Sequence, residues 1–131
     1  MFHLKLKRWT KMAKKILVVD DDEDSLNLVS KALQYAGYDI VKASDGEQTI
    51  SQYEEQKPDL VLLDVRMPTM DGYEAFFKIK EIHKDAKVIF MTAYAVDEKI
   101  HQRAKELNLT YLLMKPFSLK FLKELIADIL K

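Results

Sequence analysis

Short apolar runs alternate with longer amphipathic stretches along this chain. Five runs, each bounded by polar or turn residues, are typical of strands: 16–19, 38–43, 60–63, 88–91 and 111–114. Within 38–43, apolar and polar residues alternate only weakly. Between them, apolar residues recur at helical spacing, as do Leu26, Val29 and Leu33 after the first run. The pattern therefore predicts five strands that alternate with five helices.

The expected helices have recognisable ends. They cover about 25–36, 46 to near 57, 72–83, 96–107, and the stretch after Ser118. Gly37 suits the end of the first helix, and Ser118 is a good N-cap for the last. In the fourth helix the apolar row is expected to run from Val96 to Leu107. Strands that alternate with helices predict an α/β fold with a mostly parallel sheet and right-handed crossovers.

The third apolar run, Leu60–Leu63, ends on a carboxylate, Asp64, and turn residues follow at once. Open α/β sheets bind ligands at the carboxyl ends of their strands. Three acids, 20–22, follow the first run; Thr92 follows the fourth, and Lys115 follows the fifth. We therefore expect acids, a hydroxyl and an ammonium group to meet at one edge of the sheet.

Such a cluster has a definite chemistry. Carboxylates that are held close together repel one another and call for a cation. The chain has no cysteine, and oxygen ligands alone favour a hard ion such as Mg²⁺. A metal-bound acid cluster beside a carboxylate, a hydroxyl and a lysine suits phosphoryl transfer. Asp64 is the candidate nucleophile.

Four segments, in this order, resemble the receiver domain of bacterial-type response regulators. They are Ile16–Asp21, Asp64–Gly72, Met91–Ala93 and Lys115–Phe117, and the resemblance covers about 14–130. It implies the flavodoxin-like (βα)₅ fold, a three-layer sandwich around a parallel five-stranded sheet of order 2-1-3-4-5.

The resemblance also implies roles for individual residues. Asp64 resembles the phosphoacceptor. Asp20, Asp21 and Asp64, with the backbone carbonyl of Arg66, resemble the ligands of Mg²⁺. The domain would then be a signalling domain that assists its own phosphorylation and dephosphorylation, and not an enzyme acting on other substrates.

Two further positions resemble the switch of the family. Thr92 matches the hydroxyl that bonds the phosphoryl group, and Lys115 matches its charge partner, with the Lys115–Pro116 bond expected to be cis. Many receivers carry an aromatic residue three places before this lysine, but here the residue is Leu112. Tyr111 comes one place earlier and is expected on the opposite face of the strand.

The implied partners are proteins. The phosphoryl donor would be a phosphohistidine on a sensor histidine kinase or a histidine phosphotransfer protein, which docks near Leu28 and Phe117. Signalling would proceed through contact with an unknown downstream protein or by onward phosphotransfer. Within the family, the chain is most similar to stand-alone receivers of the sporulation-phosphorelay type.

Other functions are also compatible with an acid at the end of a strand. A phosphatase with an aspartyl-phosphate intermediate has a second aspartate two residues after the nucleophile, where this chain has Arg66. A flavin or nucleotide binder is disfavoured, because the loop after the first strand is acidic and lacks glycine. A scaffold that is never phosphorylated remains an alternative.

Composition adds few constraints. The formal net charge is zero, so no global basic field favours nucleic acid, and no apolar segment has membrane-spanning length. We therefore expect a cytoplasmic protein without nucleic-acid or membrane partners.

Residues 1–13 are basic and form an expected loose extension, with a membrane-surface anchor as the alternative. Residues 14–131 form the expected receiver domain.

Overall fold

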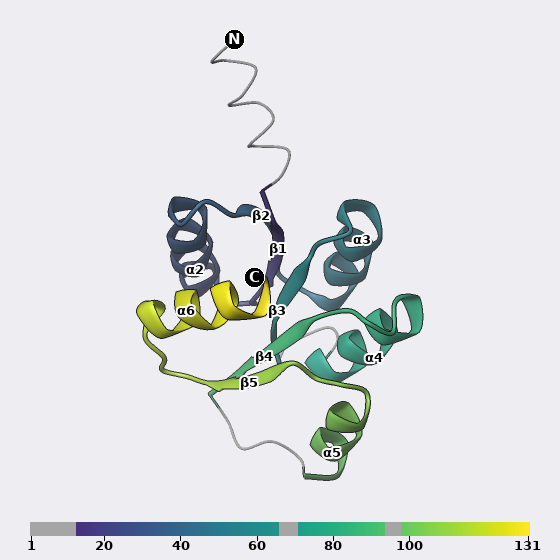
Figure 1. The fold of residues 1–131 in the computed structure, drawn as a ribbon. Helices are drawn as coiled ribbons and strands as arrows, with labels where there is room; N and C mark the ends of the chain where they lie inside the picture. The colour runs from purple at the N-terminus through teal and green to yellow at the C-terminus, as the bar shows by residue number, and fades with distance from the viewer. Residues whose placement is uncertain (1–12, 66–70, 94–97) are drawn as a thin grey trace.

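The computed structural model describes residues 13–65, 71–93 and 98–131, and in these ranges five strands alternate with five helices. The strands are β1 (Lys15–Val19), β2 (Asp39–Ala43), β3 (Leu60–Asp64), β4 (Val88–Thr92) and β5 (Tyr111–Met114). The helices are α2 (Glu23–Tyr35), α3 (Gly46–Gln56), α4 (Gly72–Ile82), α5 (Glu98–Glu106) and α6 (Leu119–Ile129). All strand pairs are parallel, in the order β2-β1-β3-β4-β5 (Figure 1). The predicted fold class and strand order are confirmed.

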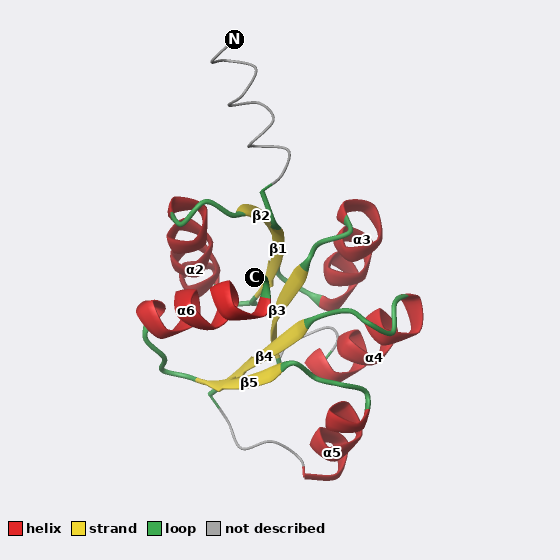
Figure 2. Ribbon diagram, viewed as in Figure 1, coloured by secondary structure: helices red, strands yellow, loops and turns green. Residues whose placement is uncertain are grey.

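Helices cover both faces of the sheet. Helices α2 and α6 lie on one face, and α3, α4 and α5 lie on the other (Figure 2). Successive strand residues point to opposite faces of the sheet. Ile16 therefore packs toward α2 and α6, whereas Leu17 packs toward the other three helices. Burial on both faces explains why the sequences of β1, β3 and β4 are almost continuously apolar.

Side-chain caps set the starts of the helices. Asp22 accepts hydrogen bonds from two backbone N–H groups in the first turn of α2. Asp71 accepts from the N–H of Glu74 at 3.1 Å in α4, and Ser118 accepts from the N–H of Phe121 at 2.9 Å in α6. These contacts satisfy donors that a helix leaves unpaired. The N-cap prediction for Ser118 is confirmed.

The predicted apolar stripes extend too far at two helix ends. Leu107 lies beyond α5 and is 43% exposed, and Ile82, the last residue of α4, is 48% exposed. At both ends the chain turns back toward the next strand, so the sheet no longer covers the stripe. Val96, the expected first residue of the fourth row, lies outside the described residues.

The helices are short. The longest in the described ranges, α2, has 13 residues, against about 20 for a bilayer-spanning helix. Across these ranges no helix combines the length and apolar character that crossing a membrane requires.

Candidate functional site

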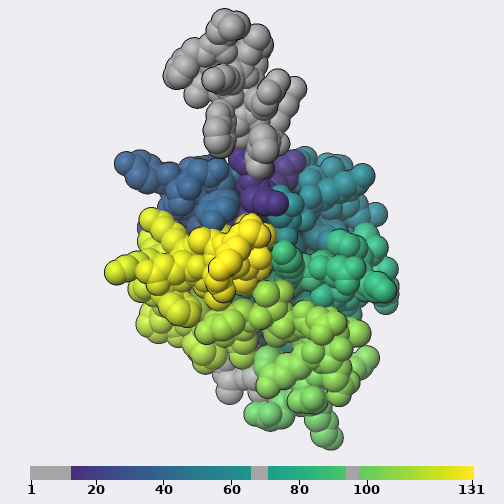
Figure 3. All heavy atoms as spheres, in the orientation of Figure 1, coloured from purple at the N-terminus to yellow at the C-terminus, as the bar shows by residue number. Residues whose placement is uncertain are grey.

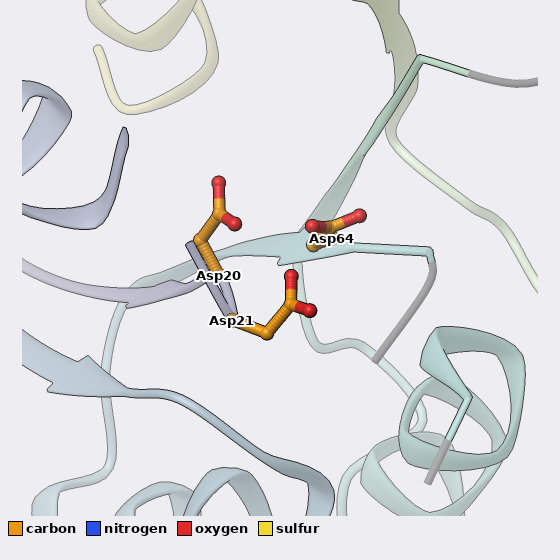
Figure 4. Close-up of side chains that lie close together, drawn as sticks. All are labelled: Asp20, Asp21 and Asp64. Carbon is orange, nitrogen blue, oxygen red and sulfur yellow. The ribbon is translucent and has the colours of Figure 1, made fainter. Parts of the chain in front are cut away.

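Three carboxylates meet at one edge of the sheet. Asp20 and Asp21 follow β1, and Asp64 ends β3, the parallel neighbour of β1. One carboxylate oxygen from each lies within 4.8 Å of the others, in the space beyond the two strand ends (Figure 4). Asp20 is 2% exposed and Asp64 is 8% exposed, whereas Asp21 faces solvent. The predicted convergence of these acids is therefore present in the structure.

Asp20 is held firmly by its surroundings. Its backbone N–H donates to the Ala43 carbonyl at 3.2 Å, which fixes it against the end of β2. Its Oδ1 accepts from the backbone N–H of Asp22 at 3.0 Å. Its Oδ2 accepts from the ammonium of Lys115 at 3.0 Å. Both carboxylate oxygens therefore have a partner, which lowers the cost of burying the charge.

Lys115 joins acids from two strands. It follows β5, and its Nζ lies 3.0 Å from Asp20 Oδ2 and 3.6 Å from Asp64 Oδ2. Burial alone would lower the pKa of Lys115, but the hydrogen bond to Asp20 and the charges of Asp64 and Asp20 outweigh it and raise the pKa. The ammonium therefore stays charged at neutral pH. The Lys115–Pro116 bond is cis, as predicted.

Replacing Lys115 with methionine is expected to lower the free energy of unfolding by about 2 kcal/mol at neutral pH without added metal, because neighbouring carboxylates lose their cation. Since the folded-state pKa is raised, this stabilisation persists from neutral pH upward and is lost only above about pH 10.4. Urea denaturation at pH 7 checks the value. Lys120→Met, an exposed lysine on α6, is the control and should change little. Equal losses in the two variants would contradict the pairing.

Thr92 lies at the same edge of the sheet. It is the last residue of β4 and is 2% exposed. Its backbone carbonyl accepts from the Lys115 N–H at 2.8 Å, and β4 pairs with β3 next to Asp64. The four strand ends that the sequence singled out thus lie along one edge of the sheet. Arg66, the fourth predicted metal ligand, lies outside the described residues.

Gly72 has a role in the site that the sequence did not reveal. It begins α4, and its N–H donates to the Val65 carbonyl at 2.6 Å. A Cβ at this position would lie 2.6 Å from Val65 Cα, and closer still to the Asp64 carbonyl oxygen. Glycine therefore lets the start of α4 approach the backbone that carries Asp64. The sequence predicts only a turn at Gly72, and its position directly after the capping residue Asp71 is the available signal of a further role.

A hollow of about 400 Å³ adjoins the acids, which we call the site hollow. Asp20 and Lys115 line it on one side, and Leu28, Met91 and Phe117 give it an apolar wall. Leu28 is 60% exposed. The space-filling view shows α2 in blue and α6 in yellow side by side on this half of the molecule (Figure 3). The two predicted docking residues, Leu28 and Phe117, therefore lie on one surface beside the carboxylates.

The residues before Lys115 lie on opposite faces of β5, as expected. Leu112 packs against the core cluster below α3, α4 and α5. Tyr111 is 39% exposed and contacts Phe121 of α6, with ring centroids 6.3 Å apart. The side chain three residues before Lys115, on the inward face of β5, is therefore aliphatic.

The donor set fits a hard divalent cation. The three acids offer oxygen atoms only, with spacings that one ion could bridge. Asp21 is exposed, so water can complete the coordination. Several clustered negative charges beside one ammonium leave an excess that a divalent ion would neutralise.

Comparison with known proteins agrees with the geometry. The family model of the response regulator receiver domain matches residues 16–127. Sporulation initiation phosphotransferase F of Bacillus subtilis is 35% identical over 119 residues, which cover 91% of this chain and 95% of that protein. The response regulator TrrA of Thermotoga maritima, solved in complex with Mg²⁺-BeF, is 34% identical with a TM-score of 0.78, over 88% of this chain and 98% of TrrA.

Some relatives are longer. The alkaline phosphatase synthesis transcriptional regulatory protein PhoP of Bacillus subtilis is 39% identical over 108 residues, or 82% of this chain. This chain spans only 44% of the length of PhoP. What these proteins share with the chain is the domain that contains the acid cluster. The chain belongs to the family of response regulator receiver domains of two-component systems.

Proposed function

We propose that the chain accepts a phosphoryl group on Asp64 from a phosphohistidine donor, with Mg²⁺ bound beside it. The main support for this proposal is the set of charged groups that surround Asp64. Its carboxylate ends a buried strand, lies within 4.8 Å of the carboxylates of Asp20 and Asp21, and is 3.6 Å from the ammonium of Lys115. A carboxylate in such a setting can act as a nucleophile toward phosphorus.

The acids would hold the metal. Asp20, Asp21 and Asp64 supply carboxylate oxygens, and the backbone carbonyl of Arg66 is the proposed fourth ligand. The bound ion supplies positive charge next to the oxygens of the incoming phosphoryl group. The Asp22 N–H and the Lys115 ammonium orient Asp20, so this ligand is positioned before a metal arrives.

The proposed transfer has one covalent step. An oxygen of Asp64 attacks the phosphorus in line, the P–N bond of the phosphohistidine breaks, and its electron pair returns to the imidazole, which takes up a proton. The result is an acyl phosphate on Asp64 and a free histidine. Lys115 pairs with a phosphoryl oxygen, which it can reach because its Nζ already lies between Asp20 and Asp64.

The product would change the charge of the site. An acyl phosphate brings roughly two negative charges, judged by phosphomonoesters, and the Thr92 hydroxyl can donate to one of its oxygens. Because the Thr92 carbonyl is bonded to the Lys115 N–H, a movement of Thr92 acts on both β4 and β5. Coupling of this kind typically amounts to about 1–3 kcal/mol. With Leu112 on β5, the change would reach the surface without the rotation of an aromatic ring.

The phosphoryl donor and the downstream target of the signal are both proposed to be proteins. The site hollow places the exposed Leu28 and the half-buried Phe117 beside Asp20, so a sensor histidine kinase or histidine phosphotransfer protein could dock there with its phosphohistidine near Asp64. The similarity to sporulation initiation phosphotransferase F, of which the match covers 95%, supports a role in relaying phosphate. We propose residues 14–131 as the receiver domain and cytoplasmic signalling by protein contact or onward transfer.

Removing Mg²⁺ is expected to stop phosphorylation. Incubation with acetyl phosphate or phosphoramidate and Mg²⁺ should add one phosphoryl group to the protein, and EDTA should reduce the rate at least about 100-fold, or about 2.7 kcal/mol in the barrier. Intact-mass spectrometry follows the adduct, and renewed addition of Mg²⁺ is the control. An adduct that forms equally fast in EDTA would contradict the proposal.

A further inference from the structure

A second hollow, of about 490 Å³, lies at the edge of the sheet opposite the acids; we call it the far-edge hollow. Tyr53 and Glu54 of α3 form one wall, and Ile82 and His83 at the end of α4 form another. Asp59, the residue before β3, completes it. Because Asp64 ends the same strand, the hollow and the phosphoacceptor candidate lie at opposite ends of β3.

The far-edge hollow has a mixed, mainly negative character. Among the described residues that line it, Glu54 and Asp59 are acidic and Lys57 is basic. Helices α3 and α4 both end here, and the carbonyls of a helix C-terminus favour positive charge. Apolar surface is also present, since Ile82 is 48% exposed. A basic segment with interspersed apolar side chains would complement this surface.

The chain itself enters the fold at this hollow. The backbone N–H of Lys15, the first residue of β1, donates to Asp59 Oδ2 at 2.8 Å. Its ammonium donates to Gln56 Oε1 at 3.1 Å, at the end of α3. Figure 1 shows α3 beside the start of β1, and the two elements are in contact. Whatever precedes Lys15 therefore begins beside the wall formed by Asp59.

The preceding residues have the required composition. Residues 1–12 contain no acid, and their basic side chains are His3, Lys5, Lys7, Arg8 and Lys11. Their large apolar side chains include Phe2, Leu4, Leu6 and Trp9. Twelve residues can span up to about 40 Å when extended, so the hollow is well within reach. The receiver function uses none of these residues.

We propose that residues 1–12 fold back and occupy the far-edge hollow. Basic side chains of the segment pair with Glu54 and Asp59, and its apolar side chains cover Ile82 and the ring of Tyr53. The tether supplies a high effective concentration, so weak individual contacts suffice. The segment stays at the far edge of the sheet and leaves Asp64 open to its donor.

Trp9 is the only tryptophan of the chain and therefore reports on the segment directly. The experiment measures quenching of its fluorescence by acrylamide in the full chain and in a free peptide of residues 1–13. Docking should make the quenching constant of the full chain several-fold smaller than that of the peptide. Glu54→Lys should raise it toward the peptide value, and so should about 1 M salt, where the Debye length is about 3 Å.

Glu55→Lys is the matched control. Glu55 is the next residue of α3, equally exposed and equal in charge, but it does not line the hollow. Protection of Trp9 that survives in Glu55→Lys and is lost in Glu54→Lys supports the proposal. Quenching equal to that of the peptide, equal effects of the two substitutions, or no effect of either would overturn it. Protection that appears only at high protein concentration would also overturn it, because it would show docking onto a second copy.

Discussion

Asp64→Asn is expected to reduce phosphorylation by a small-molecule donor at least about 1,000-fold, which corresponds to about 4 kcal/mol in the barrier. The amide has nearly the same shape as the carboxylate but no nucleophilic charged oxygen. The substitution also removes one of three neighbouring negative charges, so the fold should be at least as stable as before. The rate of adduct formation by intact mass, with urea denaturation in parallel, checks both expectations.

Asp39→Asn controls for the chemical change itself. Asp39 is an exposed acid at the start of β2, at the far edge of the sheet from the site. This variant should be phosphorylated at the rate of the unchanged protein. An Asp64→Asn variant that still forms the adduct at a comparable rate would show that another group accepts the phosphoryl.

Gly72→Ala is expected to lower the free energy of unfolding by about 3 kcal/mol and to slow phosphorylation as well. The added Cβ would lie 2.6 Å from Val65 Cα and 2.9 Å from the Val65 carbonyl oxygen. These atoms belong to the backbone and cannot rotate away, so the start of α4 must move. Because Asp64 is the preceding residue on that backbone, its carboxylate would move relative to Asp20.

Gly37→Ala is the comparison for this second prediction. Gly37 has a φ of 104° and no atom within 4 Å of an added Cβ. Alanine at this position should therefore lower the free energy of unfolding only through its unfavourable backbone conformation, by about 1–2 kcal/mol. Urea denaturation should show the larger loss for Gly72→Ala, and only that variant should be slow to accept phosphate. A Gly72→Ala protein with unchanged stability would contradict the close approach of α4.

Much of the fold could be predicted from the sequence because burial on both faces makes the three central strands, β1, β3 and β4, apolar runs. Leu60–Leu63 and Val88–Met91 stand out for that reason, and both are wholly buried. The strand order could not be derived from the pattern; it came from the resemblance of four segments to a family. The outer ends of the helices were less predictable, as Ile82 shows, because exposure there depends on where the sheet ends.

The candidate site was predictable to the extent that it follows from topology. Parallel strands share an edge, so acids after the first and third runs had to meet if those runs were neighbours. The hydrogen bond between Lys115 and Asp20 could not be predicted, since it depends on how far the Lys115 side chain reaches past the ends of β4 and β3. The crowding at Gly72 and the far-edge hollow likewise depend on distances between elements far apart in sequence.

Chemical trapping of the acyl phosphate tests the central claim most directly. The protein is phosphorylated with acetyl phosphate and Mg²⁺ and then reduced with borohydride, which converts a phosphorylated aspartate to homoserine. Tandem mass spectrometry then locates the changed residue. The account predicts homoserine at position 64 alone, and only when both donor and Mg²⁺ are present. Homoserine at position 20 or 21, or an unreduced adduct elsewhere with Asp64 intact, would contradict it.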